Sequence, residues 1–291
     1  MKFGLMAPYK QGPVEDGAYV QRLAQITEDL GFESIWAVDH VVMCPDYQSK
    51  YPYDPSGRSP FEADVVQPDP LTWLSWAGAA TTTLRLGTGI LILPLRNPLV
   101  LAKTAASLDR LSGGRLLLGI GVGWVAEEAA AVGTDFTTRG TRTDESMAAM
   151  RALWRDEPTS SFAGKTVQFD RVVSRPRPAQ PNGVPLIVGG HSPAAARRAG
   201  KYGDGFYPLG VFGPALDELL GLMREEARAA NRNPDEIEVT TAASLDPDLI
   251  EMLAGQGVGR VLVSPPTGDL DQLPASLDSF RQAVMHSSSA S

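Results

Sequence analysis

Cysteine, basic runs and long apolar segments are what this 291-residue sequence has least of. Its single cysteine, Cys44, excludes an internal disulfide and fits a reducing compartment. The formal net charge is −8 and no long basic run occurs, so nucleic acid and an anionic membrane are poor partners. No segment reaches the roughly 20 apolar residues of a membrane span, and the first residues do not have the pattern of a secretory leader. We expect a cytoplasmic protein that binds neither nucleic acid nor membrane.

Several common catalytic motifs are also missing from the sequence. It contains no Gly-x-Ser-x-Gly elbow, no Gly-Lys-Ser/Thr phosphate loop and no histidine–carboxylate spacing typical of a metal site, so we expect no metal. Histidine occurs only three times, as His40, His191 and His286. A chain with so few acid–base groups fits a bound cofactor that carries the chemistry itself.

What the sequence does contain is a repeated strand-and-helix pattern. Short apolar segments alternate eight times with segments of helical periodicity, which is the pattern of βα units. Asp69, Asn97 and Ser192 each precede a proline, the arrangement of a good N-cap followed by proline at the first helical position. Eight such units in a chain of this length predict an α/β protein, a (β/α)8 TIM barrel, which typically takes about 250 residues.

We expect one barrel domain over residues 1–286, followed by a disordered tail at 287–291. Two segments interrupt the rhythm, at about 41–68 and about 157–183, and we place both as insertions in βα loops. The first is rich in proline and tyrosine, and the second contains a predicted hairpin over 162–169. The third strand is expected over Leu86–Leu93, and the helix of the fourth unit from about Thr143.

The most informative stretch runs from Arg115 to Trp124, where an apolar strand ends in alternating glycines. Glycine at this strand exit lets a flat or anionic ligand approach the main chain closely. The spacing does not match a dinucleotide fingerprint, because Trp124 stands where that pattern has its last glycine. The stretch therefore favours a glycine-rich strand exit in an α/β fold other than the Rossmann fold.

In a (β/α)8 barrel the active site lies at the carboxyl ends of the strands. The residues expected there are Asp39, His40, Thr88, Gly89, Ile90, Gly121, Gly123, Trp124, Gly189, Gly190, His191 and Ser192. A histidine at a strand end is by itself more often structural than catalytic. Two of the three histidines at one face of the barrel favour a functional role.

Anions have two candidate sites in this scheme. The turn Gly189-Gly190-His191-Ser192 precedes a helix whose first amides favour an anion, and the alternative is an ordinary strand-to-helix turn. Arg139 and Arg142 precede the fourth helix and could hold a phosphate or pair with Asp144 and Glu145. We expect the ion pair for at least one of these arginines.

In combination, these segments resemble the bacterial luciferase-like monooxygenase superfamily. The resemblance rests on residues 34–40 (SIWAVDH), 86–90 (LGTGI), 96–98 with 102–103, 113–124 (GGRLLLGIGVGW), 139–145 with 153–154, and 189–190 with 204–206. These segments cover the chain to about residue 210. The most similar subgroup is the oxidoreductases that depend on coenzyme F420, a deazaflavin, while other members of the fold use flavin mononucleotide (FMN).

The resemblance implies a cofactor ring that lies across the strand ends, with Asp39 and His40 facing its reactive part as the catalytic residues. It also implies a non-proline cis peptide at Gly89–Ile90. The implied cofactor-binding residues are Asp39, His40, Thr88, Gly89, Ile90, Gly121, Gly123, Trp124, Val188, Gly189, Gly190, His191 and Arg139. In members that act on sugar phosphates a glutamate occupies the place of Trp124, so a sugar-phosphate substrate is not expected.

The expected function is therefore hydride transfer between coenzyme F420 and a small organic substrate, in a homodimer, with His40 as the acid–base or polarising group. One alternative is an FMN-dependent monooxygenase of the same fold, because reduced flavin activates oxygen and a deazaflavin does not. A second alternative is a protein that binds flavin or deazaflavin without turnover. The intact pair Asp39-His40 counts modestly against that second alternative.

Overall fold

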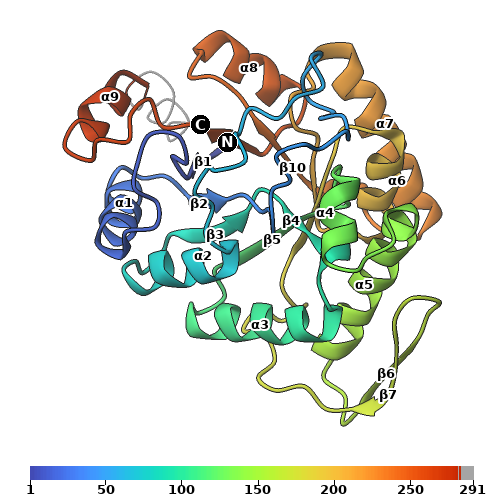
Figure 1. Ribbon diagram of the computed structural model, residues 1–291. Coiled ribbons are helices and arrows are strands. Elements are labelled where there is room, and N and C mark those ends of the chain that lie inside the picture. Colours follow the sequence, from blue (N-terminus) through green and yellow to red (C-terminus); the bar gives the residue numbers. More distant parts are fainter. Residues whose placement is uncertain (281, 283–291) are drawn as a thin grey trace.

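The computed structural model describes residues 1–280 and residue 282 of the chain. The strands of its main sheet are β1 (Lys2–Met6), β2 (Ser34–Ala37), β3 (Arg85–Thr88), β4 (Leu91–Ile92), β5 (Leu116–Gly121), β8 (Leu186–Gly189), β9 (Gly205–Tyr207), β10 (Glu238–Ala242) and β11 (Arg260–Val263). Their order is β3-β2-β1-β11-β10-β9-β8-β5-β4, all pairs are parallel, and an additional β3–β5 pairing closes the sheet. Since β3 and β4 are two parts of one barrel strand, this is the closed eight-stranded (β/α)8 barrel that the sequence predicts (Figure 1).

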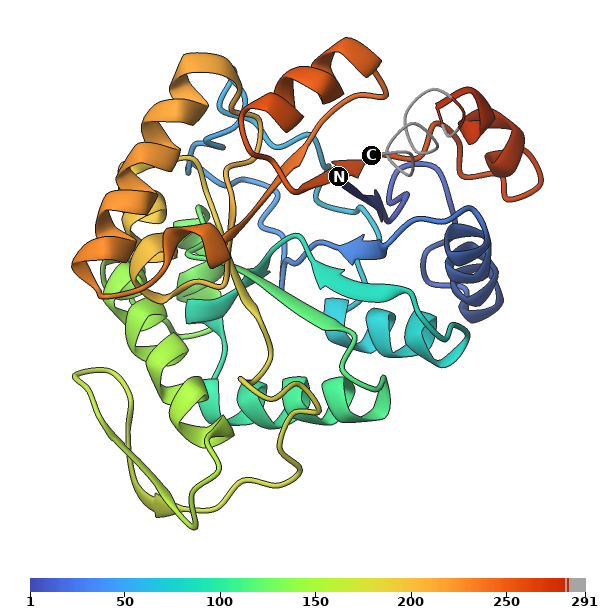
Figure 2. The ribbon, with the colours of Figure 1, turned by 180° about the vertical axis from the view of Figure 1, so that it is seen from behind.

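Helices ring the barrel on its outer face (Figure 1, Figure 2). They are α1 (Gly17–Asp29), α2 (Pro70–Ala79), α3 (Pro98–Leu111), α4 (Ala126–Ala131), α5 (Arg139–Trp154), α6 (Pro193–Tyr202), α7 (Gly213–Ala229), α8 (Pro247–Gly255) and α9 (Leu273–Phe280), with 3-10 turns at Leu93–Leu95, Phe136–Thr138 and Pro234–Glu236. The predicted caps are confirmed, because the side chains of Asp69, Asn97 and Ser192 each accept a hydrogen bond from a backbone amide in the first turn of the helix that follows.

A tryptophan fills the interior of the barrel. Trp36 from β2 is completely buried and packs with Tyr207 and other inward-facing apolar side chains. Gly87 on the neighbouring strand is required by this packing, because a Cβ atom there would lie 2.3 Å from Trp36 Cδ2. The large ring is thus accommodated only because the strand beside it lacks a side chain.

Charged groups close the amino end of the barrel. The guanidinium group of Arg260, the first residue of β11, is fully buried and contacts Glu33 at 2.9 Å and Glu238 at 2.7 Å. Each carboxylate compensates part of the cost of burying that charge. With the amino end filled, a ligand site is left to the carboxyl end.

The third barrel strand differs from the prediction over Leu86–Leu93. It breaks after Thr88, at a Gly89–Ile90 peptide bond that is cis, as the family resemblance implied. The fourth unit also differs, since α5 begins at Arg139 rather than near Thr143, and the short helix α4 precedes it.

The second insertion does not lie in a βα loop, contrary to our expectation. Its hairpin, β6 (Ser160–Ala163) with β7 (Gln168–Val172), follows α5 and precedes β8, so it belongs to an αβ connection. Glu145 of α5 accepts hydrogen bonds from the turn amides of Lys165 and Thr166, and the hairpin projects from the helix ring (Figure 1). It therefore packs on the outside of α5.

No helix in the described part of the chain is long and apolar enough to cross a membrane. The expected tail at 287–291 and His286 lie outside the described residues.

Candidate active site at the carboxyl end of the barrel

His40 lies in the loop after β2, just beyond Val38 and Asp39, and is held by a carboxylate from a distant part of the chain. Its Nδ1 lies 2.9 Å from Glu128 Oε2, and the Glu128 side chain is only 1% exposed. The other oxygen, Oε1, accepts hydrogen bonds from the backbone amides of Val41 and Val42. A carboxylate at Nδ1 fixes the ring and favours the tautomer protonated there, which leaves Nε2 as the nitrogen available to a ligand.

Both carboxylate oxygens of Asp39 are already used within the protein. Oδ1 accepts a hydrogen bond from Arg96 at 2.7 Å, and Oδ2 accepts one from the amide of Ile92 at 2.9 Å. Burial raises the pKa of Asp39, and the guanidinium group of Arg96 opposes that rise. Arg96 also contacts Asp69, the N-cap of α2. Asp39 thus ties β2 to β4, just beyond the cis peptide bond.

Ile90 forms part of the floor of the site. The side chain sits between two of the predicted glycines, where a Cβ on Gly121 would lie 2.4 Å from Ile90 Cδ1 and a Cβ on Gly189 would lie 2.5 Å from Ile90 Cγ2. These glycines therefore make room for the isoleucine. The result is an apolar side chain bordered by bare backbone, a surface that suits a flat ring system.

An aromatic wall, defined here as Tyr47, Tyr51, Tyr53 and Trp124, stands over the strand ends. The Trp124 ring packs edge-on against Tyr47, Tyr51 and His40, with centroid distances of 5.1, 5.2 and 6.1 Å. Burial raises the pKa of Tyr53 to about 12, and it also raises the pKa of Tyr51. The three tyrosines belong to the first insertion, which thus folds over the carboxyl end of the barrel.

The wall continues to the exit of β8, where the Tyr53 ring lies 4.6 Å from that of His191. The Nδ1 atom of His191 is buried and has no hydrogen-bond partner among the described residues. An orphaned polar atom in this position is a candidate contact for a polar group of a ligand.

Two backbone donors at the glycine turn before α6 are used within the protein. Gly190 adopts a φ of 121°, a backbone conformation that favours glycine, and its amide donates to the carbonyl oxygen of Tyr207. Ser192 Oγ accepts from the amide of Ala195, so that donor is also occupied. Among the described residues, the amides of His191, Ser192 and Ala194 have no acceptor.

Arg139 and Arg142, which the structure places in the first turn of α5, do not pair with Asp144 or Glu145, so that expectation was wrong. Arg139 stacks on Phe136 at 3.9 Å and Arg142 donates to the carbonyl oxygen of Pro94. Asp144 pairs with Arg198 instead. Of the possible pairs only Arg142 and Glu145 have the i,i+3 spacing that brings helical side chains together, and Glu145 instead accepts hydrogen bonds from the amides of Lys165 and Thr166.

Two predicted cofactor residues point elsewhere. Thr88 is buried and its hydroxyl donates to the carbonyl oxygen of Gly119, while Val188 belongs to the apolar cluster outside the barrel interior. Gly123 adopts a φ of 78°, and a Cβ there would overlap Ile92. The structure thus brings His40, Ile90, Trp124 and His191 to the carboxyl end of the barrel. The tyrosines of the aromatic wall join them there, and we had not predicted them as site residues, although the sequence shows them in the first insertion.

Comparison with known proteins matches residues 1–245 to the family described as luciferase-like monooxygenase. An uncharacterized protein of Mycobacterium tuberculosis is 32% identical over 272 residues, covering 90% of this chain and 93% of the relative. An F420-dependent glucose-6-phosphate dehydrogenase of Kineococcus radiotolerans is 32% identical over 227 residues, 76% of this chain and 61% of that protein. Among solved structures, a monooxygenase from Streptomyces bottropensis superposes with a TM-score of 0.81 at 23% identity, covering 99% of this chain and 100% of that one.

Proposed function

The chain belongs to the luciferase-like monooxygenase family and is an enzyme of that kind, and we propose that it transfers a hydride between coenzyme F420 and a small organic substrate. The F420-dependent dehydrogenases among its relatives support this choice of cofactor. The observation that carries the proposal is the His40–Glu128 pair at the carboxyl end of the barrel. We also propose a cytoplasmic location, which the single cysteine supports, and a homodimer.

The residues at the strand ends fit such a cofactor. Ile90, Gly121 and Gly189 would lie beneath its ring, and the buried Nδ1 of His191 would meet one of its polar groups. When bound, a deazaflavin supplies a ring carbon that gives or accepts a hydride and does not activate oxygen.

His40 acts as the acid–base group in this proposal. Its Nε2 takes a proton from, or gives one to, the substrate oxygen whose carbon changes oxidation state. Glu128 holds the imidazole in one orientation and stabilises it when it carries the extra proton, so Glu128 is a positioning residue. Asp39, through Ile92 and Arg96, positions β4 and does not exchange protons with the substrate.

The aromatic wall indicates the class of substrate. Trp124 stands where the resemblance places a glutamate in sugar-phosphate enzymes, and it is surrounded by Tyr47 and Tyr51. These rings offer apolar faces and exclude water from the site. We propose an uncharged substrate rather than a sugar phosphate.

Separate titrations of the purified protein with F420 and with FMN test the choice of cofactor. We expect F420 to bind at least about tenfold more tightly, a difference of about 1.4 kcal/mol. Tighter binding of FMN would replace the proposal by a flavin-dependent monooxygenase. A third outcome is that F420 binds, but no alcohol of a panel reduces it and no matching ketone oxidises its reduced form. That outcome would favour a protein that binds the cofactor without turnover.

A further inference from the structure

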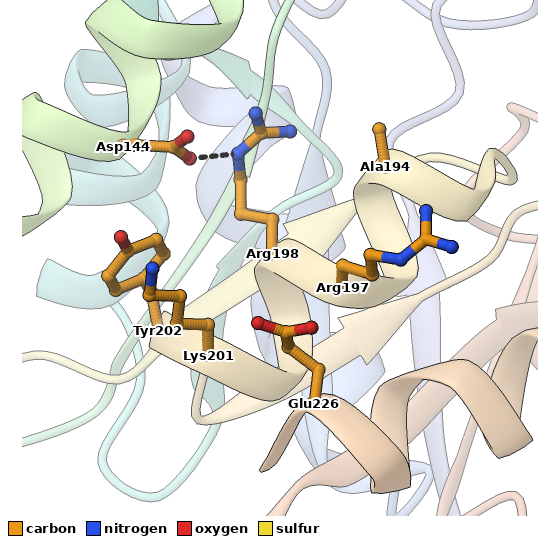
Figure 3. Close-up of a pocket in the computed structure, with 7 residues that line it drawn as sticks. All are labelled: Asp144, Ala194, Arg197, Arg198, Lys201, Tyr202 and Glu226. Carbon is orange, nitrogen blue, oxygen red and sulfur yellow. Dashed lines mark hydrogen bonds and ion pairs between the residues drawn. The ribbon is translucent and has the colours of Figure 1, made fainter. Parts of the chain in front are cut away.

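Figure 3 shows a hollow between α5, α6 and α7 whose charged side chains mostly have partners within the protein. Arg198 pairs with Asp144, and the ammonium group of Lys201 lies 5.1 Å from the centre of the Tyr202 ring. The hollow lies among the helices of the outer ring, and we assign it no ligand.

Another hollow, of about 270 Å³, lies on the catalytic face of the barrel, and we call it the β1 hollow. Its lining comes from the residues after β1, from the first insertion and from the residues after β11, and includes Pro8, Tyr9, Lys10, Pro60, Phe61 and Pro265. The strands β1 and β11 are parallel neighbours, so both end on the side of the barrel where the active site lies. Pockets that enclose a whole drug-sized ligand measure about 300–1,000 Å³, so a hollow of this size suits one part of a ligand.

Two hydrogen bonds tie the lining of the β1 hollow to the candidate active site. The hydroxyl oxygen of Tyr9 accepts a hydrogen bond at 3.0 Å from the amide of Val38, which precedes His40 by two residues. On the side of the insertion, the amide of Ser59 donates at 2.9 Å to the hydroxyl oxygen of Tyr47 in the aromatic wall. The lining is therefore one or two residues away from both the proposed acid–base group and the rings beside it.

The β1 hollow offers flat apolar faces with one cation at its edge. The rings of Tyr9 and Phe61 meet edge-on with their centroids 6.2 Å apart, and the three prolines add rigid apolar surface. The ammonium group of Lys10 lies 5.4 Å from the centre of the Phe61 ring and makes no hydrogen bond or ion pair with any described residue. An aromatic ring fits between such faces, and an ammonium group donates to an oxygen acceptor. Glu62 and Asp64 follow in the same exposed segment, so the surroundings of Lys10 favour a neutral acceptor over an anionic one.

We propose that the β1 hollow holds the remote end of the substrate, a neutral aromatic ring with an oxygen acceptor that meets Lys10; this proposal rests on the function proposed above. The substrate class is then an aryl-substituted ketone or the matching alcohol, with its reacting carbon at His40 and its ring beside Tyr9 and Phe61. Phe61 and Lys10 select the substrate and take no part in the transfer of the proton or the hydride.

Three methyl ketones with the same reacting end test the proposal: butanone, benzylacetone and para-hydroxybenzylacetone. The value of kcat/KM for each is measured from the oxidation of reduced F420 as the ketone is reduced to the alcohol. We expect the phenyl group to raise kcat/KM at least about tenfold, because it buries an apolar ring. We expect the hydroxyl group to raise it about threefold more, through the hydrogen bond from Lys10.

Two variants assign these gains to their residues. Phe61→Ala should remove the gain from the phenyl group, and Lys10→Met should remove the gain from the hydroxyl group, each through KM rather than kcat. Phe61→Leu keeps the apolar volume without the ring and gives the same comparison if Phe61→Ala lowers the melting temperature. The matched control is Lys165→Met, which removes an exposed lysine in the turn of the β6–β7 hairpin and should leave kcat/KM for all three ketones unchanged.

Calorimetric titration with para-hydroxybenzylacetone, in the absence of cofactor, separates this proposal from the proposed function. If F420 does not bind or no ketone is reduced, but the aryl ketone binds and Phe61→Ala weakens that binding, the proposed function fails and the aryl site stands. If ketones are reduced but the phenyl group brings no gain, or a gain that persists in both Phe61 variants, the aryl site is overturned and F420 remains the cofactor. Tighter binding of para-carboxybenzylacetone that is lost in Lys10→Met would overturn the neutral acceptor.

Discussion

His40 and Glu128 are 88 residues apart in the sequence and 2.9 Å apart in the structure. His40 was predictable, because it follows a strand in a βα pattern and the catalytic end of a barrel is known in advance. Glu128 was not, because it lies on a six-residue helix with no readable apolar periodicity. The pair exists only once α4 packs beside the exit of β2.

Replacing His40 separates binding from turnover. We expect His40→Ala to keep F420 affinity within about tenfold of the wild type, about 1.4 kcal/mol, and to lower turnover by roughly a hundredfold or more. Affinity comes from fluorescence titration and turnover from the change in F420 absorbance. Unchanged turnover would show that His40 is structural.

Glu128→Gln tests the positioning role. The amide presents either a donor or a weaker acceptor to His40 Nδ1, so the preferred tautomer is no longer fixed and we expect kcat to fall roughly 10- to 100-fold. KM and F420 affinity should change little, because neither group contacts the remote parts of the ligand. Glu225→Gln, an exposed carboxylate on α7, is the control. A normal kcat in Glu128→Gln would remove Glu128 from the mechanism.

Side-chain carboxylates also fix whole segments of backbone. The sequence could not show these contacts, because the loops whose amides donate to each carboxylate lie far along the chain. Glu28 at the end of α1 accepts hydrogen bonds from the amides of Thr82, Thr83 and Leu84, just before β3. Burial raises the pKa of Glu28, but these hydrogen bonds outweigh that effect and lower it to about 2. Glu28 therefore links the first unit of the barrel to the third.

The depressed pKa of Glu28 predicts a defined pH dependence. Its folded-state pKa is about 2 and its ordinary value is 4.5, so its stabilising effect is complete above about pH 5 and is lost as the pH falls toward 2. Melting temperatures of the wild type and Glu28→Gln should differ most at neutral pH and converge near pH 2. A difference that stays constant across this range would contradict the assignment.

The hairpin β6–β7 belongs to an αβ connection, and shortening it tests that placement. Replacing residues 161–171 by a three-residue glycine–serine linker removes the amides bound by Glu145 and should lower the melting temperature. The entropic cost of closing a surface loop changes only slowly with loop length, so we expect the shortened protein to fold. We expect its F420 affinity to stay within about twofold of the wild type, because the hairpin lies outside the helix ring. A large loss of affinity at a nearly normal melting temperature would mean that the hairpin shapes the site.

The barrel as an assembly was largely predictable, because its strand and helix periods, its cap–proline junctions and its length all favour one architecture. The carboxyl end was predictable in position but not in detail. Gly121 and Gly189 stood out as sites of close approach, yet only the folded barrel shows that Ile90 is what approaches them. The placement of the second insertion was wrong because periodicity gives the order of elements but not the end of the barrel at which a loop lies.

The central claim is that the cofactor ring rests on Ile90 at the strand ends, and Gly189→Ala tests it most directly. The new Cβ would lie 2.5 Å from Ile90 Cγ2, so the isoleucine must move from its place between the strands. Gly221→Ala on α7 is the control, because a Cβ there meets no atom within 4 Å. In fluorescence titrations we expect Gly189→Ala to weaken F420 binding at least about tenfold and Gly221→Ala to leave it unchanged. Wild-type affinity in a folded Gly189→Ala protein would place the cofactor elsewhere and contradict the account.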